Sequence, residues 1–134
     1  MVIAILGILA AFAIPRFVDI NKDAREASIR GLSGTLRSAA ALVHGLALAR
    51  NATGFVTLEG VNVDLVNGYP AATNTGIVAA MVNVDGFDAT PGAGTMTYTP
   101  RGYTDTAGTC NVQYAEATAA APATVTLPVT LDCS

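Results

Sequence analysis

Charged and aromatic side chains are scarce in this chain of 134 residues. Only 13% of the residues are charged and 6% are aromatic, and tryptophan is absent. A soluble globular protein usually carries about twice that share of charge. We therefore expect a chain that inserts into a membrane or packs into an assembly that covers its surface. A ligand pocket lined by aromatic rings is not favoured.

The few charges are divided unevenly along the chain. Residues 1–50 hold six of the seven basic residues and three acids, whereas residues 51–134 hold Arg101 and seven acids. A nucleic-acid-binding protein gathers basic residues into a patch or stripe, and the C-terminal part has only Arg101. The sequence therefore gives no support for nucleic acid as a partner, and the acidic part is interpreted as a surface that faces water.

Residues that could carry chemistry are also few. The single histidine, His44, lies within a predicted helix, where a lone histidine is usually packed or solvated rather than catalytic. The segment Asp85–Asp88 lacks the alternating carboxylates and closing glutamate of a calcium loop. PGAG at 91–94 lacks the lysine of a phosphate-binding loop. The sequence predicts no catalytic, cofactor-binding or metal-binding residue, and no enzyme.

Two cysteines, Cys110 and Cys133, lie in the last quarter of the chain. In an exported protein such a pair most simply forms one disulfide. Closing a loop of this length stabilises a fold by roughly 3 kcal/mol. The alternative is two unrelated buried thiols, which is less favoured because Cys133 lies so near the end of the sequence. We expect the disulfide, provided that the protein leaves the cytoplasm.

One uncharged run opens the chain, in MVIAILGILAAFAIPRF. It is shorter than the roughly 20 apolar residues that span a bilayer. Three interpretations are open: an anchor whose beginning is missing, a signal peptide cut near Ala11–Ala13, or a core helix. No basic segment precedes the run, as a signal peptide requires. A core helix that is apolar on all sides needs a larger protein around it, so the anchor is favoured.

The apolar run continues into an amphipathic helix. From residue 29 onward the apolar positions are three or four residues apart, which places them along one face of a helix. The helix is expected to end near Arg50, because Asn51 and Gly54 are end signals. At 1.5 Å per residue, one helix of about 50 residues is about 75 Å long, so its N-terminal half must project from the domain. The residues predicted to pack against the sheet are Ile29, Leu32, Leu36, Ala39, Val43 and Leu46.

After residue 54 the pattern changes to alternating residues and turns. We predict two strands around Glu59-Gly60, further strands in TMTYTP, CNVQYAEAT and TVTLPVTLDC, and a break or an edge strand at Pro128. Residues 67–76 and 84–94 are predicted as loops, and residues 77–82 as a short helix. The expected fold is α+β, with a long N-terminal α-helix packed on a small antiparallel β-sheet.

The order of these features resembles the type IV pilins, in particular the type IVa class. Residues 5–17, ILGILAAFAIPRF, match the apolar run of the family almost residue for residue. PRF followed by DINKDARE, GYPAAT at 68–73 and TYTPRGY at 97–103 resemble more narrowly the mannose-sensitive haemagglutinin (MSHA) type of pilin. The resemblance covers essentially the whole chain and is strongest in residues 1–30.

The resemblance implies a stem, residues 1–28, and a head, residues 29–134. The head comprises helix 29–50 and the sheet, and its disulfide loop spans 110–133. The stem would lie in the inner membrane before assembly and in the filament core afterwards, where small residues allow helices to approach closely. The residues expected to pack in the filament core are Ile3, Ile5, Leu6, Gly7, Ile8, Leu9, Ala10, Ala11, Phe12, Ile14 and Phe17.

Two features of the stem depart from a regular spanning helix. The segment that opens the mature family members, with its glutamate, does not precede Met1 here. We expect it to be missing, since adding about seven residues would give about 21 apolar-dominated positions before Pro15, enough to span a bilayer. The helix is also expected to kink or loosen between Gly7 and Pro15, because proline removes one hydrogen bond of the helix.

As a type IV pilin the chain would be the major structural subunit of an extracellular filament of a Gram-negative bacterium. The expected partners are other copies of the chain, the inner membrane, the prepilin peptidase, the assembly machinery, and a surface or host glycan. The filament would serve adhesion, aggregation or biofilm formation. The alternative is the major pseudopilin of a type II secretion system, whose family usually has a calcium-binding C-terminal loop and no terminal disulfide. Cys110 and Cys133 favour the pilin.

Overall fold

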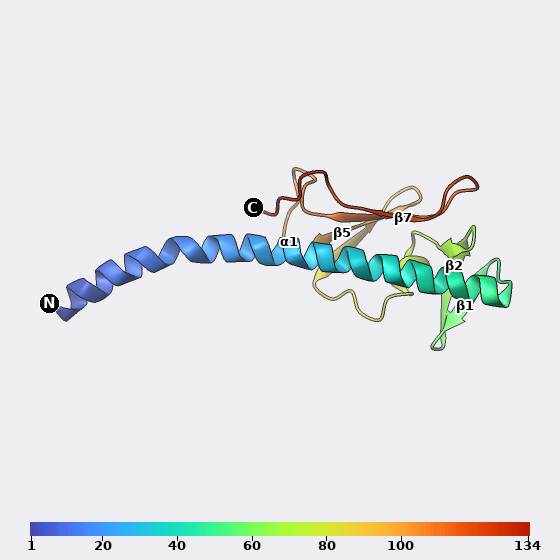
Figure 1. Ribbon diagram of the computed structural model, residues 1–134, viewed down its shortest axis with the longest axis horizontal. Coiled ribbons are helices and arrows are strands. Elements are labelled where there is room, and N and C mark those ends of the chain that lie inside the picture. Colours follow the sequence, from blue (N-terminus) through green and yellow to red (C-terminus); the bar gives the residue numbers. More distant parts are fainter.

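The computed structural model describes residues 1–11 and 20–134 with their side chains. Helix α1 (Val2–Arg50) carries the strands along its C-terminal part, while its N-terminal end lies away from them (Figure 1). The predicted α+β fold is confirmed. The elements that follow α1 are β1 (Phe55–Leu58), β2 (Val61–Val66), β3 (Tyr69–Pro70), the helical turn η1 (Asn74–Val78), β4 (Phe87–Pro91), β5 (Thr95–Pro100), β6 (Val112–Ala115) and β7 (Thr124–Thr126).

Helix α1 ends where the sequence predicts. Asn51 adopts a left-handed conformation with φ 52° and ψ 36°, and its N–H donates to the carbonyl oxygens at the end of the helix. Asparagine tolerates this conformation better than most residues. The Ala52 N–H then donates to the Ala47 carbonyl at 2.9 Å. These hydrogen bonds satisfy carbonyl groups that have no partner within the helix at its C-terminal end, and they direct the chain into β1.

The first sheet has three strands in the order β1-β2-β3. Glu59 (φ 49°) and Gly60 (φ 84°) form the two-residue turn between β1 and β2, which confirms the predicted hairpin. Asn67 (φ 50°) and Gly68 (φ 81°) form a second tight turn. Asn-Gly favours this turn because both positions need positive φ. The prediction of one continuous loop over 67–76 was therefore wrong at β3.

The second sheet has four strands in the order β4-β5-β6-β7, all antiparallel. Strand β4 lies inside the segment 84–94 that was predicted as a loop, and this prediction was wrong. β4 is an edge strand: only Phe87 is half-buried and its other residues are exposed. Because almost all of its residues are exposed, β4 lacks the alternation of apolar and polar residues that marks a strand in the sequence. Its pairing with β5 defines it as a strand.

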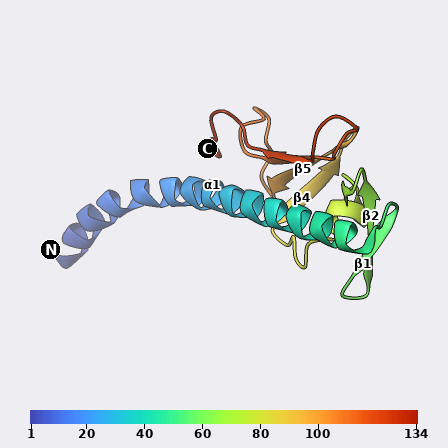
Figure 2. The ribbon, with the colours of Figure 1, turned by 45° about the vertical axis from the view of Figure 1, so that its right-hand side comes forward.

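The two C-terminal strands are shorter than predicted. β6 covers only four residues and β7 three, and β7 ends two residues before Pro128. β7 is the other edge of the second sheet, as expected from a proline, which cannot donate to a neighbouring strand. The strands also form two sheets where one was expected. Figure 2 shows β1 and β2 beside the C-terminal end of α1, and β4 and β5 nearer to the middle of the helix.

The helical turn η1 begins three residues before the predicted helix 77–82 and ends at Val78. Gly76 lies against the backbone of Ala71, where a Cβ atom would collide. The Ile77 N–H donates to the Ala71 carbonyl at 2.8 Å. The chain therefore turns at Gly76, earlier than the predicted helix begins. Only a glycine fits at this position, because any side chain would collide with Ala71.

Candidate functional site

Residues 1–11 of the stem are apolar and exposed. Ile3 is 86% exposed, and Leu6, Ile8 and Leu9 are each 61% exposed. Such a continuous exposed apolar surface marks a site of contact with lipid or with another protein. Among the described residues, no helix is both long enough and apolar enough to cross a bilayer.

The predicted filament-core residues fall into two groups. Those up to Ala11 are all exposed and lie on every side of the helix. Phe12, Ile14 and Phe17 lie outside the described residues, and so does Pro15. The predicted kink between Gly7 and Pro15 therefore falls partly outside them. A Cβ added at Gly7 would meet no atom within 4 Å, so that glycine is not required by packing within the chain.

The amphipathic part of α1 faces the two sheets. Residues from its first turns pack with β5, β6 and the cysteines in one cluster, and its last turns pack with β1 and β2 in a second. Two alanines on the same face, Ala40 and Ala47, are also buried. Of the six predicted positions, the buried ones are Ile29, Leu32, Leu36 and Val43, and the half-buried ones are Ala39 and Leu46.

Two tyrosines fill the space between α1 and the second sheet. Tyr98 and Tyr114 are fully buried. The Tyr114 hydroxyl donates to the Pro70 carbonyl at 2.7 Å and so ties the two sheets together. Among the described residues, the Tyr98 hydroxyl has no hydrogen-bond partner. Burial raises the pKa of both phenols far above the ordinary value, so both stay neutral.

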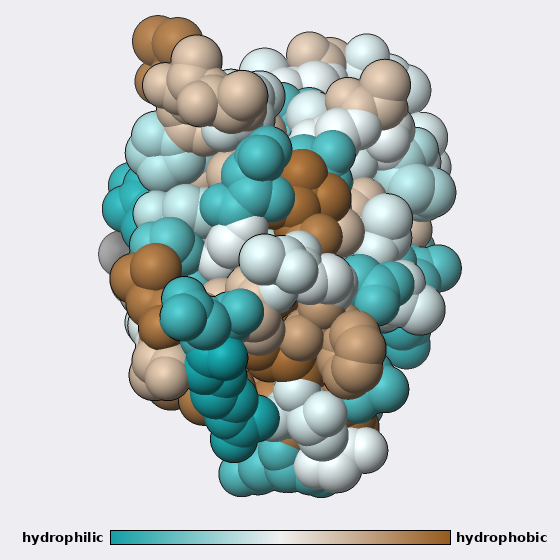
Figure 3. Space-filling model, turned by 90° about the vertical axis from the view of Figure 1, so that its right-hand side faces the viewer, coloured by the Kyte–Doolittle hydropathy of each residue, from teal (hydrophilic) through white to brown (hydrophobic). Residues whose placement is uncertain are grey.

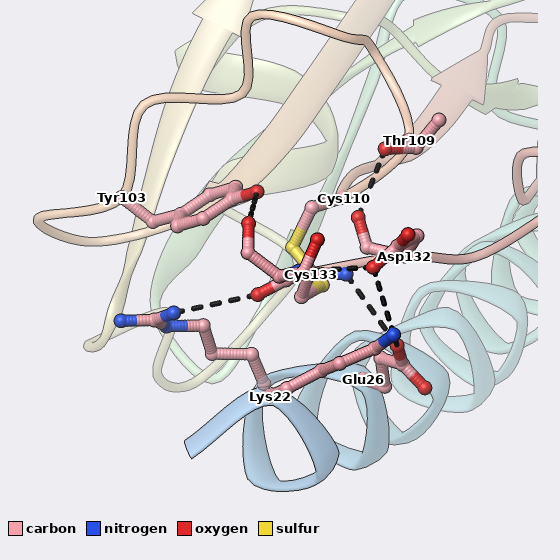
Figure 4. Close-up of polar contacts among 9 residues, drawn as sticks. Lys22, Glu26, Tyr103, Thr109, Cys110, Asp132 and Cys133 are labelled. Atoms are coloured by element: carbon pink, nitrogen blue, oxygen red, sulfur yellow. Dashed lines mark hydrogen bonds and ion pairs between the residues drawn. A yellow bond between two sulfur atoms is a disulfide. The ribbon is translucent and has the colours of Figure 1, made fainter. Parts of the chain in front are cut away.

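The C-terminus is fastened by a disulfide. Cys110 and Cys133 are bonded, as predicted, with their Cα atoms 4.8 Å apart, and both are fully buried. Beside the disulfide, the Asp132 N–H donates to the Thr109 carbonyl at 3.0 Å, and the Thr109 hydroxyl donates to the Asp132 carbonyl at 2.9 Å. We call Cys110 and residues 132–134 the C-terminal clamp (Figure 4).

The C-terminal clamp contacts the last turns of the stem through ion pairs and hydrogen bonds. Lys22 Nζ lies 3.0 Å from Asp132 Oδ1 and 3.9 Å from Glu26 Oε1. The Cys133 N–H donates to Glu26 Oε1 at 3.4 Å, and an Arg25 N–H donates to the Cys133 carbonyl at 3.4 Å. The three contacts with Asp132 and Cys133 join residues more than 100 positions apart in sequence. They hold the segment 22–26 against the head, where the helix leaves it.

Charged and polar contacts stabilise the C-terminal clamp in its position against the stem. The hydrogen bond from Lys22 and the bonds from the Ser134 backbone and hydroxyl lower the pKa of Asp132 below its ordinary value. The Arg25 guanidinium lies 4.9 Å from the ring centre of Tyr103, and the Tyr103 hydroxyl donates to the Ser134 carbonyl at 2.9 Å. None of these partners was identified from the sequence, because each contact pairs distant segments and no local pattern marks it.

His44 packs within the head. The sequence alone did not decide whether this histidine is packed or solvated. Its Nδ1–H donates to the Gly68 carbonyl at 2.8 Å, and its ring stacks on Tyr69 with the centres 3.9 Å apart. The histidine thus fastens the Asn67-Gly68 turn to α1. Across residues 1–11 and 20–134, no three or more His, Cys, Asp or Glu side chains are grouped so that they could hold a metal ion.

Comparison with known proteins identifies one informative relative. The chain is 30% identical over 103 residues to the type IV narrow pilus major component PilA5 of Thermus thermophilus. The match covers 72% of this chain and 84% of that protein. No family model and no solved structure matches the chain. The similarity therefore extends over most of both sequences.

Proposed function

This chain belongs to the type IV pilin family and is a structural subunit of a pilus, and we propose that it is the major subunit of its filament. The observation that carries the proposal is the exposed apolar surface of residues 2–11. A surface of this kind is stable only when lipid or other copies cover it. The relative in Thermus thermophilus is a major component of its own pilus, which supports the same role here.

We further propose how the stem, residues 1–28, is covered. Before assembly it lies in the inner membrane of a Gram-negative cell. After processing by the prepilin peptidase, the assembly machinery moves it into the filament core, where apolar residues from neighbouring copies pack together. Gly7, Ala10 and Ala11 are small enough for helices to approach closely. The expected weakening between Gly7 and Pro15 would let the core lengthen under load.

The finer biological role is also a proposal. The filament would serve surface adhesion, aggregation or biofilm formation, with a surface or host glycan as a partner. The MSHA type of pilin, which the sequence resembles in PRF followed by DINKDARE and in its GYPAAT and TYTPRGY stretches, is the subclass we expect. A strain that lacks this chain should then attach to surfaces less than its parent, and re-expression of the chain should restore attachment.

The test of the main proposal is electron microscopy of material sheared from the surface of the producing cells. We expect filaments whose main protein, identified by mass spectrometry, is this chain. A soluble monomer in the medium without filaments would refute the proposal. The pseudopilin alternative predicts stabilisation by calcium, so a calcium titration of the thermal unfolding temperature distinguishes it. The disulfide between Cys110 and Cys133 supports the pilin.

A further inference from the structure

Two arginines form a basic flank on one side of the head. Arg37 lies on α1 next to β7, where its guanidinium donates to the Val125 carbonyl at 3.3 Å. Arg30 lies two helical turns earlier, which places it on the same side of α1. Both are exposed. No acidic residue occurs in the sequence from residue 27 to residue 58, so this flank is positively charged.

The charges of the basic flank are not neutralised within the chain. Among the described residues, the ion pairs are Lys22 with Glu26, Lys22 with Asp132, and Arg101 with Asp88. None of them involves Arg30 or Arg37. The nearest acid along α1 is Glu26, one turn before Arg30, and its carboxylate contacts Lys22 and the Cys133 N–H. Two exposed cations are therefore available to a partner.

A hollow lies beside the basic flank. It has a volume of about 310 Å³ and lies between α1 and the segment that contains β7. Arg37, His44 and Tyr69 provide its polar groups, and alanines and a glycine provide much of the rest of its lining. The small residues leave room for a side chain from outside, so the flank offers both a charge and a recess.

Two acids lie on the β1–β2 hairpin, to which Arg50 also donates, at 2.9 Å to the Thr57 carbonyl of β1. Glu59 in its turn and Asp64 on β2 are exposed, and neither makes an ion pair among the described residues. Figures 1 and 2 show the turn of this hairpin on the side of α1 away from β7, near the C-terminal end of the helix. Figure 3, which views that end of the head, shows hydrophobic groups between hydrophilic ones. Phe55 and Val61 of the same hairpin are 55% and 50% exposed.

We propose that the basic flank of one copy binds the β1–β2 hairpin of a second copy, with Glu59 and Asp64 facing Arg30 and Arg37. The proposal rests on the proposed function as a filament subunit. Contacts between two different surfaces of the same chain propagate without closing and so build a filament. Opposite charges favour this pairing and its register, whereas an arrangement that brought like charges together would be opposed.

The test is a charge reversal with rescue in the producing strain. Arg30→Glu with Arg37→Glu, or Glu59→Arg with Asp64→Arg, should lower the yield of sheared filaments about tenfold, because each places like charges in contact. The four substitutions together restore opposite charges and should return most of the yield. Asp85→Arg is the matched control, since Asp85 is an exposed acid outside the hairpin, and it should leave the yield unchanged.

The outcomes separate this proposal from the proposed function. Absence of filaments in the parent strain would refute the function itself. Normal filament yield in either reversed variant, or no rescue in the combined variant, would overturn the contact. Normal filaments that no longer bind an anionic polymer such as heparin would assign the flank to an outside partner and would also overturn it.

A second measurement does not require reversed charges, and Arg30 and Asp64 keep one pair of opposite charges in place. Arg37→Cys combined with Glu59→Cys should join neighbouring copies in sheared filaments and produce a ladder of oligomers on a non-reducing gel. Each single cysteine should give no ladder. Filaments of the double variant that run only as monomers under oxidising conditions would contradict the contact.

Discussion

The two ends of helix α1 have the same secondary structure and opposite relations to water. The described residues of its first part are apolar on every side and exposed, whereas its part from Ile29 to Ala47 has one apolar face that the sheets bury. Burial of apolar surface stabilises both, by about 25 cal/mol per Å². In the second part that surface is buried within the chain, and in the first it is exposed in the single chain. Stability of the head and assembly of the filament should therefore be separable by mutation.

The largest expected effect is the loss of assembly caused by a charge in the stem. Leu6→Lys places an ammonium group on a surface that lipid or other copies must cover, where an unpaired charge is very costly. We expect no filaments on the cell surface by electron microscopy. The thermal unfolding temperature of the full chain in detergent should be unchanged, because Leu6 is exposed and far from the head.

Leu6→Ile is the matched control for this prediction and should assemble normally. A Leu6→Lys variant that still forms filaments would show that the stem surface is not covered in the assembly. A variant that lowers the unfolding temperature of the head would show that the two parts of α1 are not independent.

Leu36→Ala, in the second part of the helix, should instead lower the free energy of unfolding of the head. Leu36 is fully buried between α1 and the sheets. Replacing a buried leucine by alanine costs about 3–5 kcal/mol, because it removes apolar contacts and leaves a cavity. Urea unfolding of the full chain in detergent should show that loss. Ser38→Ala, at an exposed position on the same helix, should change the free energy of unfolding by less than about 0.5 kcal/mol.

Loss of the disulfide should weaken the head by a similar or smaller amount and should also affect the boundary with the stem. In the double variant Cys110→Ser and Cys133→Ser, we expect the free energy of unfolding to fall by roughly 3 kcal/mol. The C-terminal clamp would lose its covalent support, so amide hydrogen exchange should increase in residues 22–26 of α1. Unchanged exchange there would show that the polar contacts alone hold the segment.

The sequence was most informative where the structure depends on local patterns. The end of α1 at Asn51 and the hairpin turn at Gly60 follow from an asparagine and a glycine, which tolerate positive φ, and the buried face of α1 follows from the spacing of its apolar residues. Strand β4 could not be found in this way, because its pairing with β5 defines it rather than any alternation of its own. The contacts of Lys22 and Glu26 with the C-terminal clamp were also missed. They join segments more than 100 residues apart, and no local signal marks such a pair.

The smallest expected effect is the dependence of the C-terminal clamp on pH. The pKa of Asp132 is lowered in the folded chain, first by its hydrogen bond with Lys22. A lowered carboxyl pKa stabilises the fold above the pKa of the unfolded chain, and this contribution is lost as pH falls, from about pH 5 downward. Lys22→Met removes the partner, so the variant should have a slightly lower unfolding temperature than the parent at pH 7. Because both side chains are substantially exposed, the difference should be small and should shrink in high salt. Unfolding temperatures measured between pH 7 and pH 2.5 should converge as Asp132 becomes protonated. A difference that stayed constant over this range would mean that Lys22 contributes through packing rather than through its charge.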